Sequence, residues 1–322
     1  MSRLKTHAGS RQARTSAEFG KVAVLLGGDS TEREISLLTG NAVLAALKRR
    51  GVDAHPFDPA QQPIQSLQTE GFDRAFLALH GPGGEDGLMQ GALEWLGIPY
   101  TGSGVLACAL TMDKLKTKRV VMGAGIAAPP YVVLASLADL PHALRELELP
   151  LIVKPASQGS SVGIAKVKAA AQLERAYEEA RAIDSLVFAE RFIAGDELTV
   201  GVLGSGSLPS IRIVPATEFY DYQAKYLRDD TQYHCPSGLD GREEAELGAT
   251  ALAAFRATDC FGWGRVDFMR EAATRTLYFI EINTTPGMTD HSLVPMAARA
   301  AGIGFDELAW RVLESSLSRE RK

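Results

Sequence analysis

The segments Gly264-Arg-Val-Asp-Phe-Met-Arg270 and Leu277-Tyr-Phe-Ile-Glu-Ile-Asn283 carry the pattern that decides the fold of this chain. Both segments are predicted to be β-strands, in which successive side chains point to opposite faces of a sheet. Because only a short connection separates the segments, we expect an antiparallel pair. Each strand carries an acidic side chain, so the pair is a candidate site of chemistry as well as of structure.

Four polar residues lie on matching positions of this predicted pair. Arg265 and Asp267 share one face of the first strand. Glu281 and Asn283 share one face of the second. Two carboxylates and an amide oxygen form an all-oxygen set that suits the hard ion Mg²⁺. The competing interpretation is a salt-bridged face, in which Asp267 and Glu281 pair with Arg265 or point to solvent.

The first hundred residues predict an α/β unit built on a parallel sheet. Residues 22–28 form a short apolar run ending in Gly-Gly, and residues 35–50 follow with the periodicity of an amphipathic helix. A second apolar run, residues 72–80, leads into the glycine-rich loop 80–87 and a helix that ends near residue 96. Polar groups collect where the strands end, which is the usual ligand side of an open parallel sheet.

The rest of the chain predicts two further α+β regions. A long polar segment, residues 218–241, contains few core residues, and loops of this length are usually lids or binding elements. Strands are expected at residues 131–134, 151–155, 162–167, 186–193, 198–203 and 211–214, and helices from residue 112 and at residues 138–147, 169–181, 243–258 and 305–317.

Two glycine-rich segments suggest nucleotide binding with different strength. Lys154 ends a strand shortly before the loop Gly159-Ser-Ser-Val-Gly163, whose amides could approach phosphate oxygens while the lysine offsets their charge. A plain hairpin turn explains the same residues. The sequence contains no P-loop motif. Residues 102–107 match Gly-x-Gly-x-x-Ala but lack the acid expected about 20 residues later, so a tight, closely packed turn is the better interpretation.

The first loop contains acidic residues that allow a structural or a functional interpretation. Thr31 and Glu34 have the spacing of a helix capping box. Negative charge near a helix N-terminus is stabilising by about 0.3–1 kcal/mol, which would also account for Glu32. His80 leads the second loop, and a single histidine leaves the same two interpretations open.

The composition indicates a soluble globular protein of two or three domains. The chain has 322 residues, of which 46% are hydrophobic, and its net charge of −5 offers no field for nucleic acid. Cys108, Cys235 and Cys260 form no paired motif, which fits a reducing cytoplasm. Residues 1–20 contain no signal-peptide run, and no stretch is long enough to span a membrane. We expect a polar tail there, with an organelle transit peptide as the alternative.

Taken in order, these motifs resemble those of the ATP-grasp superfamily, and specifically of the D-alanine:D-alanine ligases, over nearly all of residues 21–318. The matching segments are Leu26-Gly-Gly-Asp-Ser-Thr-Glu-Arg-Glu-Ile-Ser36, His80-Gly-Pro-Gly-Gly-Glu-Asp-Gly87, Pro99-Tyr-Thr-Gly-Ser-Gly104, Met112-Asp-Lys114, Val153-Lys-Pro155 with Gly159-Ser-Ser-Val-Gly163, Phe219-Tyr-Asp-Tyr-Gln-Ala-Lys-Tyr226, Gly264-Arg-Val-Asp267, Glu281-Ile-Asn-Thr-Thr-Pro-Gly-Met288 and His291-Ser-Leu-Val-Pro295. The number of ordered matches is what identifies the family.

The resemblance implies a three-domain ATP-grasp architecture of mixed α/β and α+β type, with a parallel sheet in the N-terminal domain. ATP would lie between the central and C-terminal lobes, and the Mg²⁺ site and a lid at residues 218–241 would belong to the C-terminal lobe. The implied divisions are a flexible tail at residues 1–20, a substrate domain at 21–110, a central lobe at 111–195 and a C-terminal lobe at 196–322.

The resemblance also assigns roles to individual residues of this sequence. For ATP, the implied residues are Lys114, Lys154 and Lys225 for phosphates, Glu190, Arg191 and Ile193 for adenine, and Glu197 for ribose. For two Mg²⁺ or Mn²⁺ ions, they are Asp267, Glu281 and Asn283. For the two amino acids, they are Glu32, Ser160 and Tyr226 around the first, His80 near it, Arg265 and the Gly287 amide at the oxyanion, and Ser292 with Leu293 at the second carboxylate.

The implied activity is ligation of two D-alanines through a D-alanyl phosphate, for peptidoglycan precursor synthesis, by a cytoplasmic homodimer whose ligands are small molecules. Gln158 and Arg191 depart modestly from the residues that relatives carry there. Tyr226 favours a dipeptide product, because relatives that make D-alanyl-D-lactate differ at that position.

Two alternatives remain at this stage. Another ATP-grasp carboxylate-amine ligase would keep the ATP and metal residues but need not keep Glu32, Tyr226 and Ser292, all of which are present. A non-catalytic nucleotide-binding module is disfavoured by the complete metal set.

Overall fold

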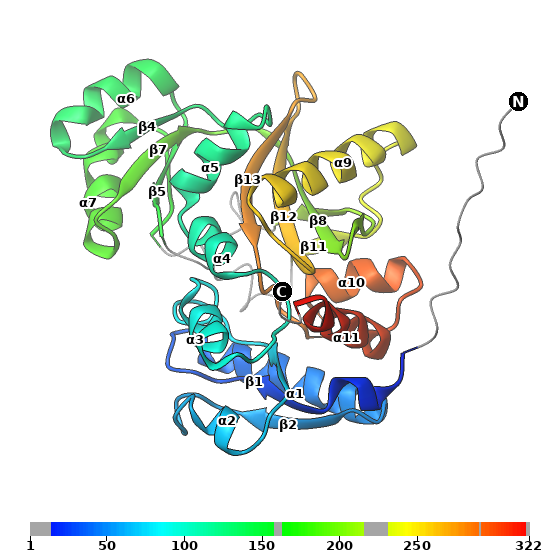
Figure 1. Cartoon of the computed structure of the whole chain (residues 1–322). Coiled ribbons are helices and arrows are strands. Elements are labelled where there is room, and N and C mark those ends of the chain that lie inside the picture. The colour runs from blue at the N-terminus through cyan, green and yellow to red at the C-terminus, as the bar shows by residue number, and fades with distance from the viewer. Residues whose placement is uncertain (1–13, 158–162, 216–230, 290, 320–322) are drawn as a thin grey trace, which may run out of the picture.

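The computed structural model describes residues 14–157, 163–215, 231–289 and 291–319. The described strands form three sheets, which follow one another along the chain and are each covered by helices (Figure 1). Within these residues, the longest helices are too short or too polar to cross a membrane. All three cysteines are free thiols.

The first sheet is parallel and has the order β2-β1-β3, as expected for this region. Its central strand is almost entirely buried and packs against a long helix through Val43, Ala46 and Leu47. The loops that follow β1 and β3 therefore emerge at the same edge of the sheet. The elements are η1 (Ser16–Phe19), β1 (Lys21–Leu25), α1 (Arg33–Arg49), β2 (Asp53–Phe57), α2 (Ser66–Thr69), β3 (Arg74–Leu77) and α3 (Leu88–Leu96).

The second sheet is antiparallel, with the order β4-β7-β5-β6. Side chains alternate along β5, so Leu151 and Val153 pack under α6 and α7 whereas Ile152 and Lys154 point to the uncovered face. That face is available to line a ligand cavity. The elements are β4 (Tyr131–Leu134), η2 (Leu137–Asp139), α6 (Leu140–Leu147), β5 (Leu151–Pro155), β6 (Ala165–Val167), η3 (Ala170–Gln172), α7 (Leu173–Ile183) and β7 (Val187–Arg191).

The third sheet is also antiparallel, with the order β11-β10-β8-β12-β13, and β9 pairs with β8. Val266 and Phe268 of β12 join an apolar cluster with α9, while Arg265 and Asp267 point to the opposite face. The elements are α4 (Val105–Met112), α5 (Lys114–Gly123), β8 (Gly195–Leu203), β9 (Gly206–Ser207), β10 (Ile211–Val214), β11 (Gln232–His234), α9 (Gly241–Ala257), β12 (Trp263–Glu271) and β13 (Leu277–Asn283).

The C-terminal helices connect the third sheet to the first domain. α10 (Leu293–Ala300) and α11 (Phe305–Glu314), followed by η4 (Ser315–Arg319), share one apolar cluster with β1 and α1 (Figure 1). Arg49 of α1 pairs with Asp306 of α11 at 2.5 Å, and Arg50 pairs with Glu307. The first domain is thus held beside the end of β13, where the predicted metal residues lie.

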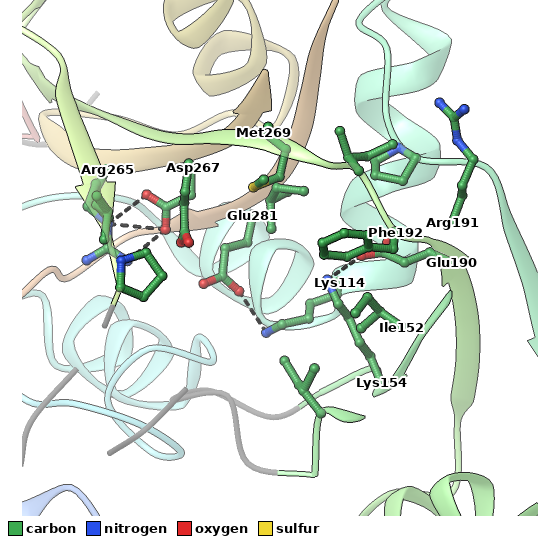
Figure 2. Close-up of a pocket in the computed structure, with 18 of the residues that line it drawn as sticks. Lys114, Ile152, Lys154, Glu190, Arg191, Phe192, Arg265, Asp267, Met269 and Glu281 are labelled. Carbon is green, nitrogen blue, oxygen red and sulfur yellow. Dashed lines mark hydrogen bonds and ion pairs between the residues drawn. The ribbon is translucent and has the colours of Figure 1, made fainter. Parts of the chain in front are cut away.

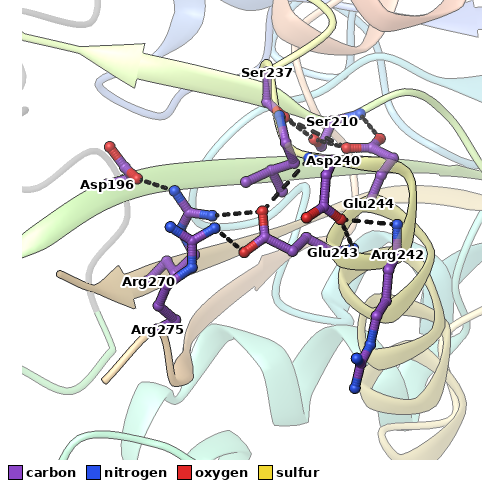
Figure 3. A network of polar contacts seen from close by, with 10 residues as sticks. Asp196, Ser210, Ser237, Asp240, Arg242, Glu243, Glu244, Arg270 and Arg275 are labelled. Carbon is purple, nitrogen blue, oxygen red and sulfur yellow. Dashed lines mark hydrogen bonds and ion pairs between the residues drawn. The ribbon is translucent and has the colours of Figure 1, made fainter. Parts of the chain in front are cut away.

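A polar network fixes the N-terminus of α9 to the third sheet (Figure 3). Asp240 caps the helix by accepting hydrogen bonds from the first backbone amides at 2.9 Å. Glu243 pairs with Arg270 at 3.1 Å and also with Arg275, and Arg270 reaches Asp196 at 2.5 Å. Arg270 lies on the face of β12 opposite to Asp267. These contacts therefore support the strand pair that carries Asp267 and Glu281.

Several strands have the bounds that the sequence predicts, including β4, β5, β10 and β13. The capping box predicted at Thr31 and Glu34 is wrong. α1 begins at Arg33, and its N-cap residue, Glu32, makes no capping hydrogen bond. The loop is closed instead by Ser30, whose hydroxyl accepts from the Glu32 amide at 3.1 Å and donates to the His80 carbonyl at 2.7 Å. This arrangement directs Glu32 toward the second glycine-rich loop.

Candidate active site

A cavity of about 170 Å³ lies where the uncovered faces of the second and third sheets meet (Figure 2). Its lining includes Lys154, Glu190 and Arg191 from the second sheet, Ile193 after it, Glu197 from β8, and Asp267 and Glu281 from the strand pair. Apolar side chains such as Ile152, Ile213 and Met269 make up much of the remaining wall. A cavity that combines apolar walls with several charged groups suits a nucleotide whose base is buried and whose phosphates meet the charges.

A second cavity of about 570 Å³ lies between the first domain and the loop that follows β13. Its lining includes Glu32, His80 and Glu85 from the first domain, and Asn283, Gly287, Ser292 and Leu293 from the C-terminal region. Lys114, Arg265, Glu281 and Leu293 line both cavities. A molecule in the first cavity can therefore present one end to a molecule in the second.

The lysines of the first cavity are paired with carboxylates. Lys154 pairs with Oε1 of Glu190, and Lys114 pairs with Oε2 of Glu281 at 3.0 Å. Lys118, which does not line the cavity, reaches Oε2 of Glu190 at 2.5 Å. Burial alone would raise the pKa of Glu190, but Lys118 and Lys154 together lower it to about 2. Glu190 is therefore an acceptor of hydrogen bonds at any physiological pH.

The two late strands bring the predicted metal residues together. Asp267 lies directly opposite Glu281, and Arg265 directly opposite Asn283, so the antiparallel pair is confirmed. The register shifts beside this pair, because Phe268 is opposite Phe279 and Ile280 of β13 is the extra residue of a β-bulge. Directly opposed residues of an antiparallel pair share a face, with Cβ atoms about 4.5–5.5 Å apart. The acidic side chains consequently project into the same cavity wall.

Arg265 holds the Asp267 carboxylate in a fork. Its Nε lies 2.9 Å from Oδ1 and its Nη2 lies 2.8 Å from Oδ2, and the Thr199 hydroxyl donates to Oδ1 at 2.5 Å. The salt-bridged interpretation of this face is thus part of the structure. It does not exclude a metal, because the carboxylate keeps further lone pairs.

The donor set fits Mg²⁺ in kind. Two carboxylates and the amide of Asn283 supply only oxygen ligands, which is the preference of that ion. Within the described ranges no cluster contains three His, Cys, Asp or Glu side chains able to hold a metal. A site here would therefore depend on the amide and on oxygens from a bound phosphate or water, which is usual for Mg²⁺.

Thr39 of α1 links the first domain to the loop that follows β13. Its hydroxyl lies 3.0 Å from Nε2 of His80 and accepts from the Met288 amide at 3.3 Å. Gly287, next to Met288, sits against Ser292, since a Cβ at position 287 would lie 2.8 Å from the Ser292 hydroxyl oxygen. A side chain at position 287 would therefore displace the Ser292 hydroxyl, which accepts from the Thr289 amide at 2.9 Å.

The loop that carries Glu32 is anchored by a partly buried ion pair. Arg33 donates to Oδ2 of Asp58 at 2.6 Å and to the Gly28 carbonyl at 2.5 Å. Asp58 in turn accepts from the amides of Gly28 and Ala60, each at 3.0 Å. Burial would raise the pKa of Asp58, but the Arg33 guanidinium and these amides lower it below its ordinary value of 3.8.

This pair predicts a defined effect on stability. We expect Asp58→Asn to reduce the free energy of unfolding by about 1.5–3 kcal/mol at pH 7. Because folding lowers the Asp58 pKa, its contribution is complete above about pH 4 and is lost as pH falls through the folded-state value. Urea unfolding of both proteins from pH 7 to pH 3 measures the difference. A difference that does not shrink in acid would contradict the assigned ion pair.

Most residues singled out in the sequence line one of the two cavities. Ser160, Lys225 and Tyr226, together with most of the proposed lid at residues 218–241, lie outside the described residues. The described part of that segment contains β11, and Tyr233 of this strand lines the second cavity.

Sequence reasoning missed Thr39, Asp58 and Lys118, which act through other residues. Lys118 follows Lys114 by one helical turn, and that spacing is the only signal that could have indicated it.

Two antiparallel sheets meet at the first cavity, and one carries Lys154 while the other carries the acidic strand pair. This arrangement defines an ATP-grasp ligase. The chain belongs to the D-alanine–D-alanine ligase family. The family model described as "D-ala D-ala ligase C-terminus" matches residues 120–314, and the model described as "D-ala D-ala ligase N-terminus" matches residues 58–103.

Similar proteins cover almost the whole chain. A D-alanine–D-alanine ligase of Alkalilimnicola ehrlichii is 56% identical and aligns over 94% of this chain and 97% of its own. D-alanine–D-alanine ligase B of Chromobacterium violaceum is 54% identical over 92% and 98%. Among solved structures, the Bacillus anthracis ligase complexed with ATP is 34% identical, with a TM-score of 0.82 over 93% and 98%. VanG D-Ala:D-Ser ligase of Enterococcus faecalis is 29% identical, with a TM-score of 0.79 over 92% and 99%.

Proposed function

We propose that this protein joins two D-alanines into D-alanyl-D-alanine, with ATP converted to ADP and phosphate, to supply peptidoglycan precursor synthesis. The observation that carries this function is the shared wall of the two cavities, formed by Lys114, Arg265, Glu281 and Leu293. It allows the terminal phosphate of a nucleotide in the first cavity to meet the carboxylate of a small amino acid in the second.

The first step is attack of the D-alanine carboxylate on the γ-phosphorus of ATP. Lys114 and Lys154 offset charge on the phosphates, and Lys225 is proposed to reach the transferred group. Mg²⁺ held by Asp267, Glu281 and Asn283 would neutralise further phosphate charge. The products are D-alanyl phosphate and ADP.

In the second step the amine of the other D-alanine attacks the acyl carbonyl. Negative charge then develops on the carbonyl oxygen, and we assign Arg265 and the Gly287 amide to stabilise it. Collapse of the tetrahedral intermediate forms the amide bond and releases phosphate.

The amino acids are positioned from both halves of the molecule. Glu32, with Ser160 and Tyr226, is assigned to the ammonium group of the first D-alanine, and His80 lies near it. Ser292 and the Leu293 amide are assigned to the carboxylate of the second, at the N-terminus of α10, where backbone amides favour an anion. For ATP, Glu190, Arg191 and Ile193 are assigned to the adenine and Glu197 to the ribose. Water would hydrolyse the acyl phosphate, so residues 218–241 are assigned as a lid.

We further propose a homodimer in a reducing cytoplasm. The free cysteines fit such a compartment. Leu88, Trp95 and Leu106 of α3 and α4 are 70%, 91% and 66% exposed, which is the kind of surface that a subunit interface covers. Light scattering of the purified chain would measure the oligomeric state.

One product analysis tests the function. The enzyme is supplied with ATP and Mg²⁺ and, in separate reactions, with D-alanine, L-alanine, D-serine or D-lactate, and products are identified by mass. We expect D-alanyl-D-alanine with one ADP per dipeptide, and no product from L-alanine alone. A different product, or turnover with L-alanine but not D-alanine, would show that the protein is another carboxylate-amine ligase.

Tyr226 is expected to determine the second nucleophile. We predict that Tyr226→His lowers D-alanyl-D-alanine synthesis about tenfold and gains D-alanyl-D-lactate when D-lactate is supplied with D-alanine. Mass spectrometry of the mixed reaction gives the product ratio. Tyr226→Phe is the control, because it removes the hydroxyl without adding an imidazole. An unchanged product ratio in Tyr226→His would remove Tyr226 from the specificity argument.

A further inference from the structure

Lys118 is a cation that lies behind the wall of the first cavity and is only 1% exposed. Its ammonium group donates to Oε2 of Glu190 at 2.5 Å and to the Pro129 carbonyl at 3.2 Å. Glu190 and Pro129 both line the cavity, whereas Lys118 does not. A fully buried lysine is rare unless it is paired, so this one needs an explanation in terms of what it holds.

The two oxygens of Glu190 are held by different lysines. Lys118 takes Oε2 from behind the wall, and Lys154 takes Oε1 from the cavity side. The side chains of Glu190 and Lys154 come from adjacent strands, β7 and β5. The set carries two positive charges against one negative charge, so one unit of positive charge remains at the cavity.

We propose that Lys118 is a positioning residue for the nucleotide, which fixes the Glu190 carboxylate in the cavity wall and leaves the charge of Lys154 available to phosphate. The inference rests on the proposed function, because it assigns Glu190 and Lys154 to ATP. Lys118 itself makes no contact with the nucleotide in this assignment.

Electrostatics explain why a second lysine is needed. With Lys154 as its only partner, Glu190 would form a neutral pair, and opposite charges in a poorly solvated site attract strongly. The carboxylate would turn toward Lys154 and hold it away from the phosphates. Lys118 holds Oε2 while Lys154 contacts Oε1, so the single negative charge of Glu190 is shared between two ammonium groups and does not neutralise Lys154 alone. Burial lowers the pKa of Lys118 and contact with Glu190 opposes this, which is the behaviour of a group whose charge depends on its partner.

The competing explanation is packing. The Lys118 ammonium lies 5.7 Å from the centre of the Tyr131 ring and 5.8 Å from that of Phe188, so the residue also contributes to a small apolar cluster. A packing role would lower stability and reduce the apparent kcat in proportion to the active fraction, and would leave the KM values and the ADP Kd unchanged. It would not change nucleotide affinity separately from D-alanine affinity.

The test uses Lys118→Met, which keeps the length of the side chain and removes its charge. Lys116→Met is the matched control, because Lys116 lies on the same helix, is 67% exposed at its side chain and pairs with Asp113 at the helix start. ADP binding is measured by calorimetry, and the KM values for ATP and D-alanine by coupled assay. For Lys118→Met we expect the ADP Kd and the ATP KM to rise about tenfold, with kcat and the D-alanine KM within about threefold of wild type.

A double-mutant cycle decides whether Lys118 acts through Glu190. If it does, Lys118→Met combined with Glu190→Gln binds ADP within about twofold of Glu190→Gln alone. If the two substitutions raise the ADP Kd independently, so that their factors multiply in the double variant, the inference is overturned. Equal ADP affinity in Lys118→Met and Lys116→Met would also overturn it. If Lys118→Met does not fold, Lys118→Gln, which removes the charge but keeps a hydrogen-bond donor, replaces it in both comparisons. Failure of the wild type to bind ADP or turn over would instead contradict the proposed function.

Discussion

Replacement of Asp267 by asparagine is expected to abolish dipeptide synthesis, with kcat lower by at least about 10²–10³-fold. The substitution removes the charge of a proposed metal ligand and weakens the fork that holds Arg265, so both the phosphate and the oxyanion would lose stabilisation. The fold should persist, because asparagine fills the same volume and can still accept from Thr199. Phosphate release in the presence of D-alanine is the measurement.

Asp196→Asn provides the matched control for Asp267→Asn. Asp196 lies on the neighbouring strand β8 and also pairs with an arginine, Arg270, but it lies outside both cavities. We expect its kcat to stay within about twofold of wild type. A folded Asp267→Asn protein that releases phosphate at the wild-type rate would refute the metal role of Asp267.

Arg265→Met is expected to have the second largest effect, a loss of kcat of about 10²–10³-fold, equivalent to about 2.7–4 kcal/mol. Arg265 lines both cavities and is held 2.8–2.9 Å from the Asp267 oxygens, so its guanidinium is fixed before substrate binds. Removal of the charge should raise the barrier for formation of the tetrahedral intermediate and leave the ATP KM within about threefold of wild type.

Two variants separate the charge of Arg265 from its shape. Arg265→Lys keeps the charge and loses the fork, so an intermediate rate is expected. Arg275→Met removes an exposed arginine from the turn of the same hairpin and should behave as wild type. Arg265→Met with unchanged kcat would eliminate the arginine from the oxyanion assignment.

The sequence predicted the bounds of several strands of the sheets. β13 and β5 are both rich in apolar residues and lie between clear breaks, so both were predicted with the correct bounds. The start of α1 was not, because Thr31 and Glu34 have the right spacing for a cap while Ser30 closes the loop through a contact with His80. That contact spans 50 residues and has no signature in local sequence.

The sequence predicted the residues that line the two cavities. It did not predict the residues that hold those side chains in place. Glu281 and Asp267 follow from strand alternation and composition. Lys118 and Asp58 do not, because their partners, Glu190 and Arg33, come from distant parts of the chain and only the fold brings them together. The family resemblance supplied roles for the cavity-lining residues, and the residues behind the wall required the structure.

The most direct measurement of the central claim is the position of metal in crystals of the protein grown with Mn²⁺ and ADP. Anomalous scattering from manganese locates the ions without reference to the protein density. We predict anomalous peaks beside the oxygens of Asp267, Glu281 and Asn283, at the end of the first cavity that opens to the second. Ordered ADP in the cavity without a manganese peak at these oxygens, or a peak held by other residues, would contradict the account.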